Sequence, residues 1–144
     1  MSEMSEEDYL VKRVEEQIEW YGDKASYNQS RYKICRRIEL IMAVCIPIVL
    51  LIGIDFSKII VGIASAIIAA STGIQGIYKF HENWIEYRAT SEVLKHEKFL
   101  YLIRSGIYKN INEPFYDLVE RIESITSHEN INWSQVHRPQ VADK

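Results

Sequence analysis

The chain has 144 residues, of which 47% are hydrophobic and 26% are charged, and its formal net charge at pH 7 is −3. This length suits a single domain and leaves no room for a membrane unit joined to a catalytic domain. A mild negative charge argues against a nucleic-acid partner, because nucleic-acid binding needs a basic face.

The N-terminal segment predicts the start of a long helix. It lacks the apolar core of a signal peptide, and Ser5 precedes three acidic residues, which is the pattern of a helix N-cap and first turn. Beyond it, apolar or small residues recur in steps of four and three, as in a coiled coil. This seam comprises Leu10, Val14, Gln17, Ile18, Tyr21, Ala25, Asn28, Tyr32 and Cys35. We predict a cytosolic helix over 5–37 that packs against the C-terminal helices and continues into the first apolar run.

Two uncharged runs, 40–54 and 59–78, make the middle of the chain its most apolar part. As a helix, the second run is about 30 Å long, which matches the hydrocarbon core of a bilayer. The sequence therefore predicts an all-α membrane protein with a two-helix transmembrane hairpin. We place the spans at 38–54 and 59–78, and expect the long cytosolic extensions to form a helical bundle.

Basic residues orient the predicted hairpin. They flank its two outer ends at Arg31, Lys33, Arg36, Arg37, Lys79 and Arg88, whereas the turn between the spans holds only Lys58. The positive-inside rule then places both termini in the cytoplasm and the turn outside.

The second span divides into faces on a helical wheel. Isoleucines on one face suit lipid. A second face is a small-residue stripe, which lets helix backbones approach closely, and it comprises Gly62, Ala66, Ala69, Gly73 and Gly76. A third face is polar, with Ser65, Thr72 and Gln75, and Lys79 at its cytosolic end. These polar side chains either hydrogen-bond to a neighbouring helix or line a wetted path, and both interpretations stay open here.

Two further helices are predicted after the membrane. Residues 79–105 are expected to continue the second span as one helix that Gly106 ends. Pro114 marks the start of a short helix over 113–127, and its buried stripe comprises Phe115, Leu118, Val119, Ile122 and Ile125. We expect 130–133 to dock back onto the bundle and 134–144 to form a flexible tail.

No recognisable catalytic constellation is present. There is no HExxH pair of histidines, no glycine-rich loop that opens a helix, and no base spaced to activate Cys35 or Cys45. His81 with Glu82 and Glu86 would make at most a weak metal site, and a solvated helix surface is the favoured interpretation. The sequence predicts no enzyme, no cofactor and no metal site.

Several motifs together resemble a known family. The first, YLxxRxxxQxxWYxxK, contains Arg13, Gln17, Trp20, Tyr21 and Lys24. The second, WxxYRxxSExLKxEKF, follows the second span and contains Trp84, Tyr87, Arg88, Glu92 and Lys95. Across nearly the whole chain this combination resembles the bacterial SLATT superfamily, the SMODS- and SLOG-associating two-TM effectors, and is most similar to a branch known only as a domain of unknown function.

The resemblance implies a membrane effector that forms a homo-oligomeric pore or ion channel in the bacterial inner (plasma) membrane. Such effectors are proposed to act in conflict or abortive-infection systems, and a separate nucleotide-sensing or nucleotide-synthesising protein would switch this one. If there is a pore, we expect Ser65, Thr72 and Gln75 to line it and a ring of Lys79 to favour anions.

Two alternatives are kept beside the pore. One is a membrane-anchored helical scaffold or signalling module that binds a cytosolic partner without a pore. The other, a soluble bundle with the hairpin in its core, is disfavoured because the apolar runs exceed what a small bundle hides.

The second motif also places charges on one helix face, because Arg88, Glu92 and Lys95 lie at positions i, i+4 and i+7. Arg13 and Gln17 are expected to meet this face if the N-terminal helix packs alongside. The result is either a polar helix junction or a subunit or coupling interface, and the sequence does not choose between them.

Overall fold

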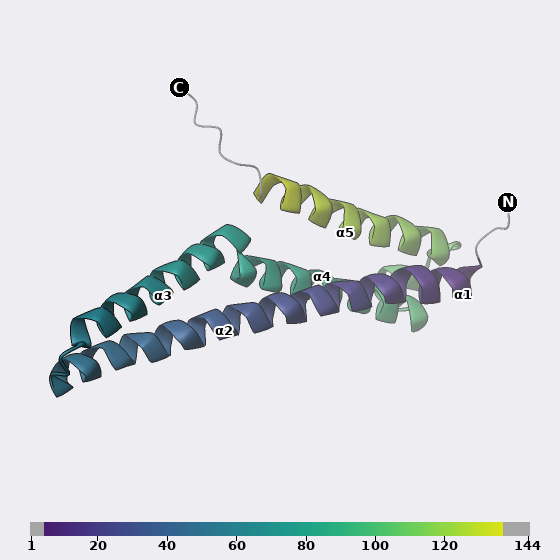
Figure 1. Ribbon diagram of the computed structural model, residues 1–144. Helices are drawn as coiled ribbons and strands as arrows, with labels where there is room; N and C mark the ends of the chain where they lie inside the picture. The colour runs from purple at the N-terminus through teal and green to yellow at the C-terminus, as the bar shows by residue number, and fades with distance from the viewer. Residues whose placement is uncertain (1–4, 137–144) are drawn as a thin grey trace, which may run out of the picture. The chain divides into compact units, whose positions relative to one another are not determined.

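A computed structural model of the protein describes residues 5–136, with side chains described as far as residue 128. The described residues form helices and turns without a strand, as Figure 1 shows, so the predicted all-α fold is confirmed. The elements are α1 (Glu6–Tyr9), a π-helical segment (Leu10–Glu15), α2 (Glu16–Ile52), α3 (Ser57–Tyr78), α4 (Phe80–Leu102), a 3-10 turn (Gly106–Lys109) and α5 (Pro114–Val136).

The N-terminal helix begins where the sequence predicts. The Ser5 side chain accepts a hydrogen bond of 3.1 Å from the backbone N–H of Asp8, which satisfies a donor that the helix itself leaves free. From α1 the chain stays helical through the π-helical segment into α2, which passes Pro47 and ends at Ile52. The predicted continuity from the N-terminal helix into the first apolar run is confirmed. The wider π turn at Leu10–Glu15 has no counterpart in the sequence prediction.

The contacts of the chain group it into two compact units. We call one the bundle unit, which contains the described residues up to Asp23 and from Tyr87 onward, and the other the hairpin unit, Lys24–Glu86. Helices α2 and α4 each contribute residues to both units.

The bundle unit has an apolar core rich in tyrosine. Val14 and Tyr21 from the predicted seam are buried there, in one cluster with Leu94 of α4 and Leu118 of α5, so this part of the seam packs against the C-terminal helices as predicted. The complete cluster is Tyr9, Val14, Tyr21, Leu94, Tyr101, Tyr108, Leu118 and Ile122.

Helix α5 confirms its predicted start and its predicted apolar stripe. It begins at Pro114, whose missing N–H costs nothing at the first helical position. Leu118 and Ile122 are buried, and the rest of the stripe packs around them. The helix extends to Val136, beyond the predicted end at 127. The side chains of 130–133 and the predicted tail beyond Val136 lie outside the described residues.

In the hairpin unit, the C-terminal half of α2 and α3 lie side by side and a short turn joins them (Figure 1). Gly53 follows the last residue of α2 with a φ of +68°, a conformation that favours glycine. Ala64 and Ser71 are the buried residues of α3, whereas most large apolar side chains of the two helices are exposed.

One helix among the described residues is long and apolar enough to cross a membrane, and it contains α3. Only 11% of its most apolar stretch is buried, whereas the core helix of a soluble protein is mostly buried. Helix α2 is not such a helix, because Arg36, Arg37 and Glu39 stand close before its uncharged part, which runs from Leu40 to Ile52. The transmembrane hairpin with two spans therefore stays a prediction.

The prediction that α4 continues the second span without interruption is wrong. Lys79 separates α3 from α4 with a left-handed backbone, φ +48° and ψ +44°. Its N–H still donates to the Gln75 carbonyl (2.9 Å), and the Asn83 side chain donates to the Tyr78 carbonyl (3.0 Å). A side chain thus satisfies a carbonyl at the break, and no glycine or proline marks the position in the sequence.

Candidate functional site

A nearly buried carboxylate joins the two helices of the hairpin unit. Glu39 lies immediately before the uncharged part of α2, and its side chain is 12% exposed. Its Oε1 accepts hydrogen bonds from Thr72 Oγ1 (3.1 Å) and from Gln75 Nε2 (2.5 Å) of α3. Its Oε2 accepts from Arg36 Nη1 (3.0 Å), one helical turn earlier in α2. Glu39 is therefore the acceptor that gathers the polar side chains of the hairpin.

A pocket of about 300 Å³ opens beside Glu39 in the hairpin unit. Tyr32 and His81 stand on its wall with ring centroids 4.7 Å apart, and Trp84 of the second motif lies 5.7 Å from His81. The lining residues are Tyr32, Arg36, Glu39, Thr72, Gln75, Gly76, His81 and Glu82. The pocket thus combines two carboxylates, one guanidinium, one imidazole and an aromatic wall.

The four residues predicted to line a path do not lie together in the structure. Thr72 and Gln75 come together on Glu39, whereas Ser65 is exposed and does not line the pocket. Lys79 sits in the break after α3 rather than on the continuation of its polar face. The contacts of Thr72 and Gln75 are those of the helix-to-helix interpretation, and the lining of a path by Ser65, Thr72, Gln75 and Lys79 stays a prediction.

The small-residue stripe of α3 does not pack within the described chain. A Cβ atom added at Gly62, Gly73 or Gly76 would meet nothing within 4 Å, and Ala66 and Ala69 are exposed as well. The close approach to α2 occurs on a different face. There Ser71 is buried and its hydroxyl donates to the Cys35 carbonyl at 3.5 Å.

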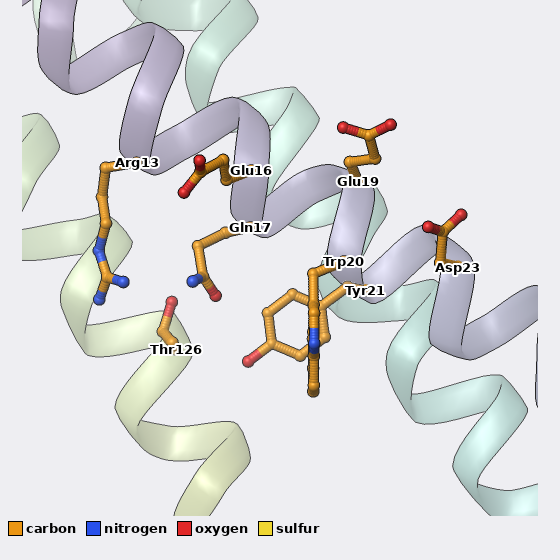
Figure 2. Close-up of a pocket in the computed structure, with 8 residues that line it drawn as sticks. All are labelled: Arg13, Glu16, Gln17, Glu19, Trp20, Tyr21, Asp23 and Thr126. Carbon is orange, nitrogen blue, oxygen red and sulfur yellow. The ribbon is translucent and has the colours of Figure 1, made fainter.

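A second pocket, of about 570 Å³, lies in the bundle unit and is drawn in Figure 2. Arg13 and Gln17 reach from the N-terminal helix toward Thr126 of α5, whereas the carboxylates of Glu19 and Asp23 point away from α5. Its lining residues are Arg13, Glu16, Gln17, Glu19, Trp20, Tyr21, Asp23 and Thr126, so four residues of the first motif meet here.

Arg13 is bound at the edge of this pocket by Glu123 of α5. Its Nε and Nη2 donate to the two carboxylate oxygens at 3.0 and 2.9 Å, and the Tyr9 hydroxyl donates to the same carboxylate at 3.2 Å. The hydrogen bonds from Arg13 hold the pKa of Glu123 below its usual value, against the effect of burial. Burial and the nearby Glu123 charge raise the pKa of Tyr9 to about 12.

The expected meeting of Arg13 and Gln17 with the charged face of α4 is wrong. Arg13 pairs with α5, and Gln17 lines the pocket opposite Thr126. Arg88, Glu92 and Lys95 are at least half exposed and pair among themselves on the surface of α4. The N-terminal helix contacts other α4 residues instead, because Lys98 bonds Glu15 and the Ser91 hydroxyl donates to the Ile18 carbonyl (3.2 Å).

Three aromatic residues from the two motifs, Trp20, Tyr21 and Tyr87, meet in the bundle unit. Trp20 and Tyr21 have ring centroids 4.9 Å apart, and the Tyr87 ring lies 6.0 and 6.1 Å from them. The ring of Tyr21 is buried in the core, and Trp20 keeps 48% of its surface exposed beside the pocket. Lys24, the last residue of the first motif, contributes its carbonyl as the acceptor of the Asn28 side-chain amide (2.8 Å).

Sequence reasoning missed the polar groups that hold these contacts. Glu39 and Glu123 stand at positions that the sequence indicates as ordinary surface charges, and no local pattern distinguishes them. The one available signal was at Glu39, a carboxylate directly adjoining an apolar run, where an unpaired charge is costly.

Metal-ligating side chains do not gather in the part of the chain that the structure describes, where no group of three or more His, Cys, Asp or Glu is placed to hold an ion. Cys35 and Cys45 are free thiols.

Comparison with known proteins identifies a family. The sequence model of the family described as "Protein of unknown function (DUF4231)" matches residues 16–115, which include most of both motifs and all of α3. No curated protein and no solved structure matches the chain. The wider SLATT resemblance stays a prediction.

Proposed function

We propose that this chain, which belongs to the DUF4231 family of proteins of unknown function, is a membrane protein whose hairpin assembles into a homo-oligomeric pore or ion channel. One observation carries the proposal. In the hairpin unit most large apolar side chains and the small-residue stripe are exposed. Contacts within one described chain therefore bury neither of these two surfaces.

The exposed apolar side chains support a lipid environment. Leu51, Ile59 and Ile77 each expose at least 60% of their surface, and they belong to helices without charge between residues 40 and 54 or 59 and 78. Apolar surface of this extent is rare on soluble monomers and marks membrane or protein contacts. It also argues against a soluble bundle that would bury the hairpin in its core.

The open stripe supports association between copies. Gly62, Gly73 and Gly76 would accept the backbone of another helix at close range, because outside the adjoining backbone of α3 no described atom lies within 4 Å of where a Cβ would stand. One hairpin cannot enclose a path for ions, so a pore requires several copies around a common axis. Three further parts of the proposal rest on the SLATT resemblance: location in the bacterial inner membrane, a role in bacterial defence, and switching by a separate nucleotide-sensing or nucleotide-synthesising protein. The cytoplasmic location of both termini rests on the basic residues that flank the hairpin.

The proposal is tested by the mass of the full chain in detergent together with ion flux through liposomes that contain it. We expect a mass of several chains and a flux that depends on the protein. In a background with Cys35 and Cys45 replaced by alanine, Thr72→Cys should react with water-soluble thiol reagents and lose flux. Ile67→Cys, on the isoleucine face of the same helix, is the matched control and should stay unreactive. Flux with unreactive cysteines at 65, 72 and 75 would remove α3 as the lining helix.

A second candidate is the anchored scaffold or signalling module, which the pocket of the bundle unit favours. Trp20 is half exposed there, and Glu16, Glu19 and Asp23 are the acidic residues among those that line it. Arg13 is the basic residue of the lining and already bonds Glu123, so the pocket suits a cationic protein side chain better than a nucleotide phosphate. Quenching of Trp20 fluorescence by a lysine-rich peptide, absent in Trp20→Phe and with a glutamate-rich peptide, would support this candidate. Absence of flux alongside such binding would favour it over the pore.

A further inference from the structure

We propose that Glu39 determines the charge selectivity of the path and makes it prefer cations. This inference rests on the proposed pore and reverses the anion preference that a ring of Lys79 predicts. It follows from the position of Glu39 beside Thr72 and Gln75, two of the residues that are predicted to line the path.

Two residues of the polar face of α3 are hydrogen-bonded to the Glu39 carboxylate. Thr72 and Gln75 donate to the same oxygen, Oε1, at 3.1 and 2.5 Å. A surface that Thr72 and Gln75 line therefore contains a carboxylate from α2 as well. Lys79 is not among the residues that line the pocket, and it lies in the backbone break beyond α3.

Glu39 is more enclosed than the charge that pairs with it. Arg36 is its ion-pair partner, but the Arg36 side chain is 63% exposed and that of Glu39 is 12% exposed. The carboxylate is therefore the less exposed charge of the pair, and its contacts with Thr72 and Gln75 cover it. Glu82 adds a second carboxylate to the lining, and the His81 ring lies tilted against that of Tyr32. In a homo-oligomer every copy repeats this arrangement, and rings of carboxylates select cations in other channels.

A purely structural role for Glu39 has to be separated from selectivity. Its three hydrogen bonds tie α2 to α3, and a carboxylate beside an apolar run is costly unless it is satisfied in this way. Glu39→Gln separates the two roles, because the amide oxygen can still accept from Thr72 and Gln75 while the charge is removed. Glu39→Asp is the matched counterpart, since it keeps the charge and shortens the side chain.

The experiment measures the reversal potential of the full chain in a bilayer under a potassium chloride gradient, with far-UV circular dichroism of each variant as a folding check. We expect a cation-preferring wild type, a potassium-to-chloride permeability ratio that falls several-fold toward unity in Glu39→Gln, and a ratio that Glu39→Asp retains. Lys79→Gln should leave the preference for cations in place.

Three results would overturn the inference, and they separate it from the proposed function. An anion-preferring wild type contradicts it directly. An unchanged ratio in a folded Glu39→Gln, even with lowered thermal stability, would assign Glu39 to helix packing alone. Absence of conductance from the wild type removes the proposed pore and this inference with it, whereas the first two results leave the pore intact.

Discussion

Glu97 of α4 and Arg121 of α5 are joined by two parallel hydrogen bonds, with Nε 3.0 Å from Oε2 and Nη2 2.7 Å from Oε1. The Tyr108 hydroxyl donates to the same carboxylate at 2.9 Å. Glu97 is 5% exposed, so its charge is held inside the bundle unit by these three donors. The pair thus connects α5 to α4 by a contact with defined geometry, and Tyr108 links it to the apolar core.

Glu97→Gln should destabilise the bundle unit. The substitution removes the charge that strengthens the hydrogen bonds from Arg121, and an amide offers the guanidinium one acceptor oxygen in place of two. We expect a loss of about 2 kcal/mol, since a hydrogen bond to a charged group contributes more than a neutral one. The measurement is thermal unfolding of the full chain in detergent. Glu92→Gln, which breaks only exposed pairs with Arg88 and Lys95, should stay close to the wild type. Equal melting temperatures for Glu97→Gln and wild type would contradict the assigned role.

The bundle unit should lose stability in acid through the same carboxylate. Hydrogen bonds from Arg121 hold the pKa of Glu97 below its usual value of 4.5, against the effect of burial, and hydrogen bonds from Arg13 do the same for Glu123. A folded-state pKa below the unfolded value means that the contribution is complete above the unfolded pKa and is lost as pH falls through the folded pKa. Melting temperatures measured from pH 7 down to pH 3 should therefore fall below about pH 4.5. They should fall less steeply in Glu97→Gln, and a slope identical to the wild type would count against the prediction.

The change in thermal stability on substitution of Lys79 distinguishes a helix break at this residue from an uninterrupted helix. A residue other than glycine at φ +48° is strained, so Lys79→Gly should preserve or raise thermal stability, by up to about 1 kcal/mol. If the helix ran uninterrupted through this position, as the sequence predicts, the same substitution would cost about 1 kcal/mol. Lys79→Val is the matched variant and should be the less stable of the two, because branching at Cβ disfavours the left-handed region. A lower melting temperature for Lys79→Gly than for Lys79→Val would indicate a continuous helix.

Gly73→Ile should weaken association without disturbing the single chain. A Cβ at this position meets nothing within 4 Å in the described structure, so we expect the loss to come from contacts with other copies. Ala70→Ile is the control, because it adds similar bulk to an exposed position of the same helix outside the small-residue stripe. The readout is the mass of the detergent complex together with its melting temperature. If both quantities are unchanged in Gly73→Ile, the stripe has no part in assembly.

The orientation of the hairpin is tested by labelling single cysteines in intact cells, in a background without Cys35 and Cys45. A membrane-impermeant thiol reagent should reach Ser57→Cys at the start of α3 and should not reach Ser5→Cys at the N-cap of α1. The reason is that basic residues flank the two ends of the hairpin that adjoin the termini, whereas the turn between the spans holds only Lys58. Segments rich in lysine and arginine stay in the cytoplasm. Labelling of position 5 and protection of position 57 would mean the inverted orientation.

The sequence by itself determined the features that depend on one helix alone. The N-cap at Ser5 and the start at Pro114 are found where local capping and proline chemistry predict them. The seam through Val14 and Tyr21 and the stripe through Leu118 and Ile122 follow from which side chains a helix of 3.6 residues per turn places on one face, so no knowledge of the neighbouring helix is needed.

Only the tertiary structure decided which polar groups meet. Glu39 and Gln75 are 36 positions apart, and Arg13 and Glu123 are 110 positions apart. Nothing in either local pattern selects those partners over other charges on the same faces. The break at Lys79 is also unmarked in the sequence, because a positive φ is unfavourable for lysine and the Asn83 side chain that donates to the Tyr78 carbonyl is not a recognised helix-stop signal. Apolar periodicity is a property of one helix, whereas a hydrogen bond or an ion pair depends on which two helices the fold brings together.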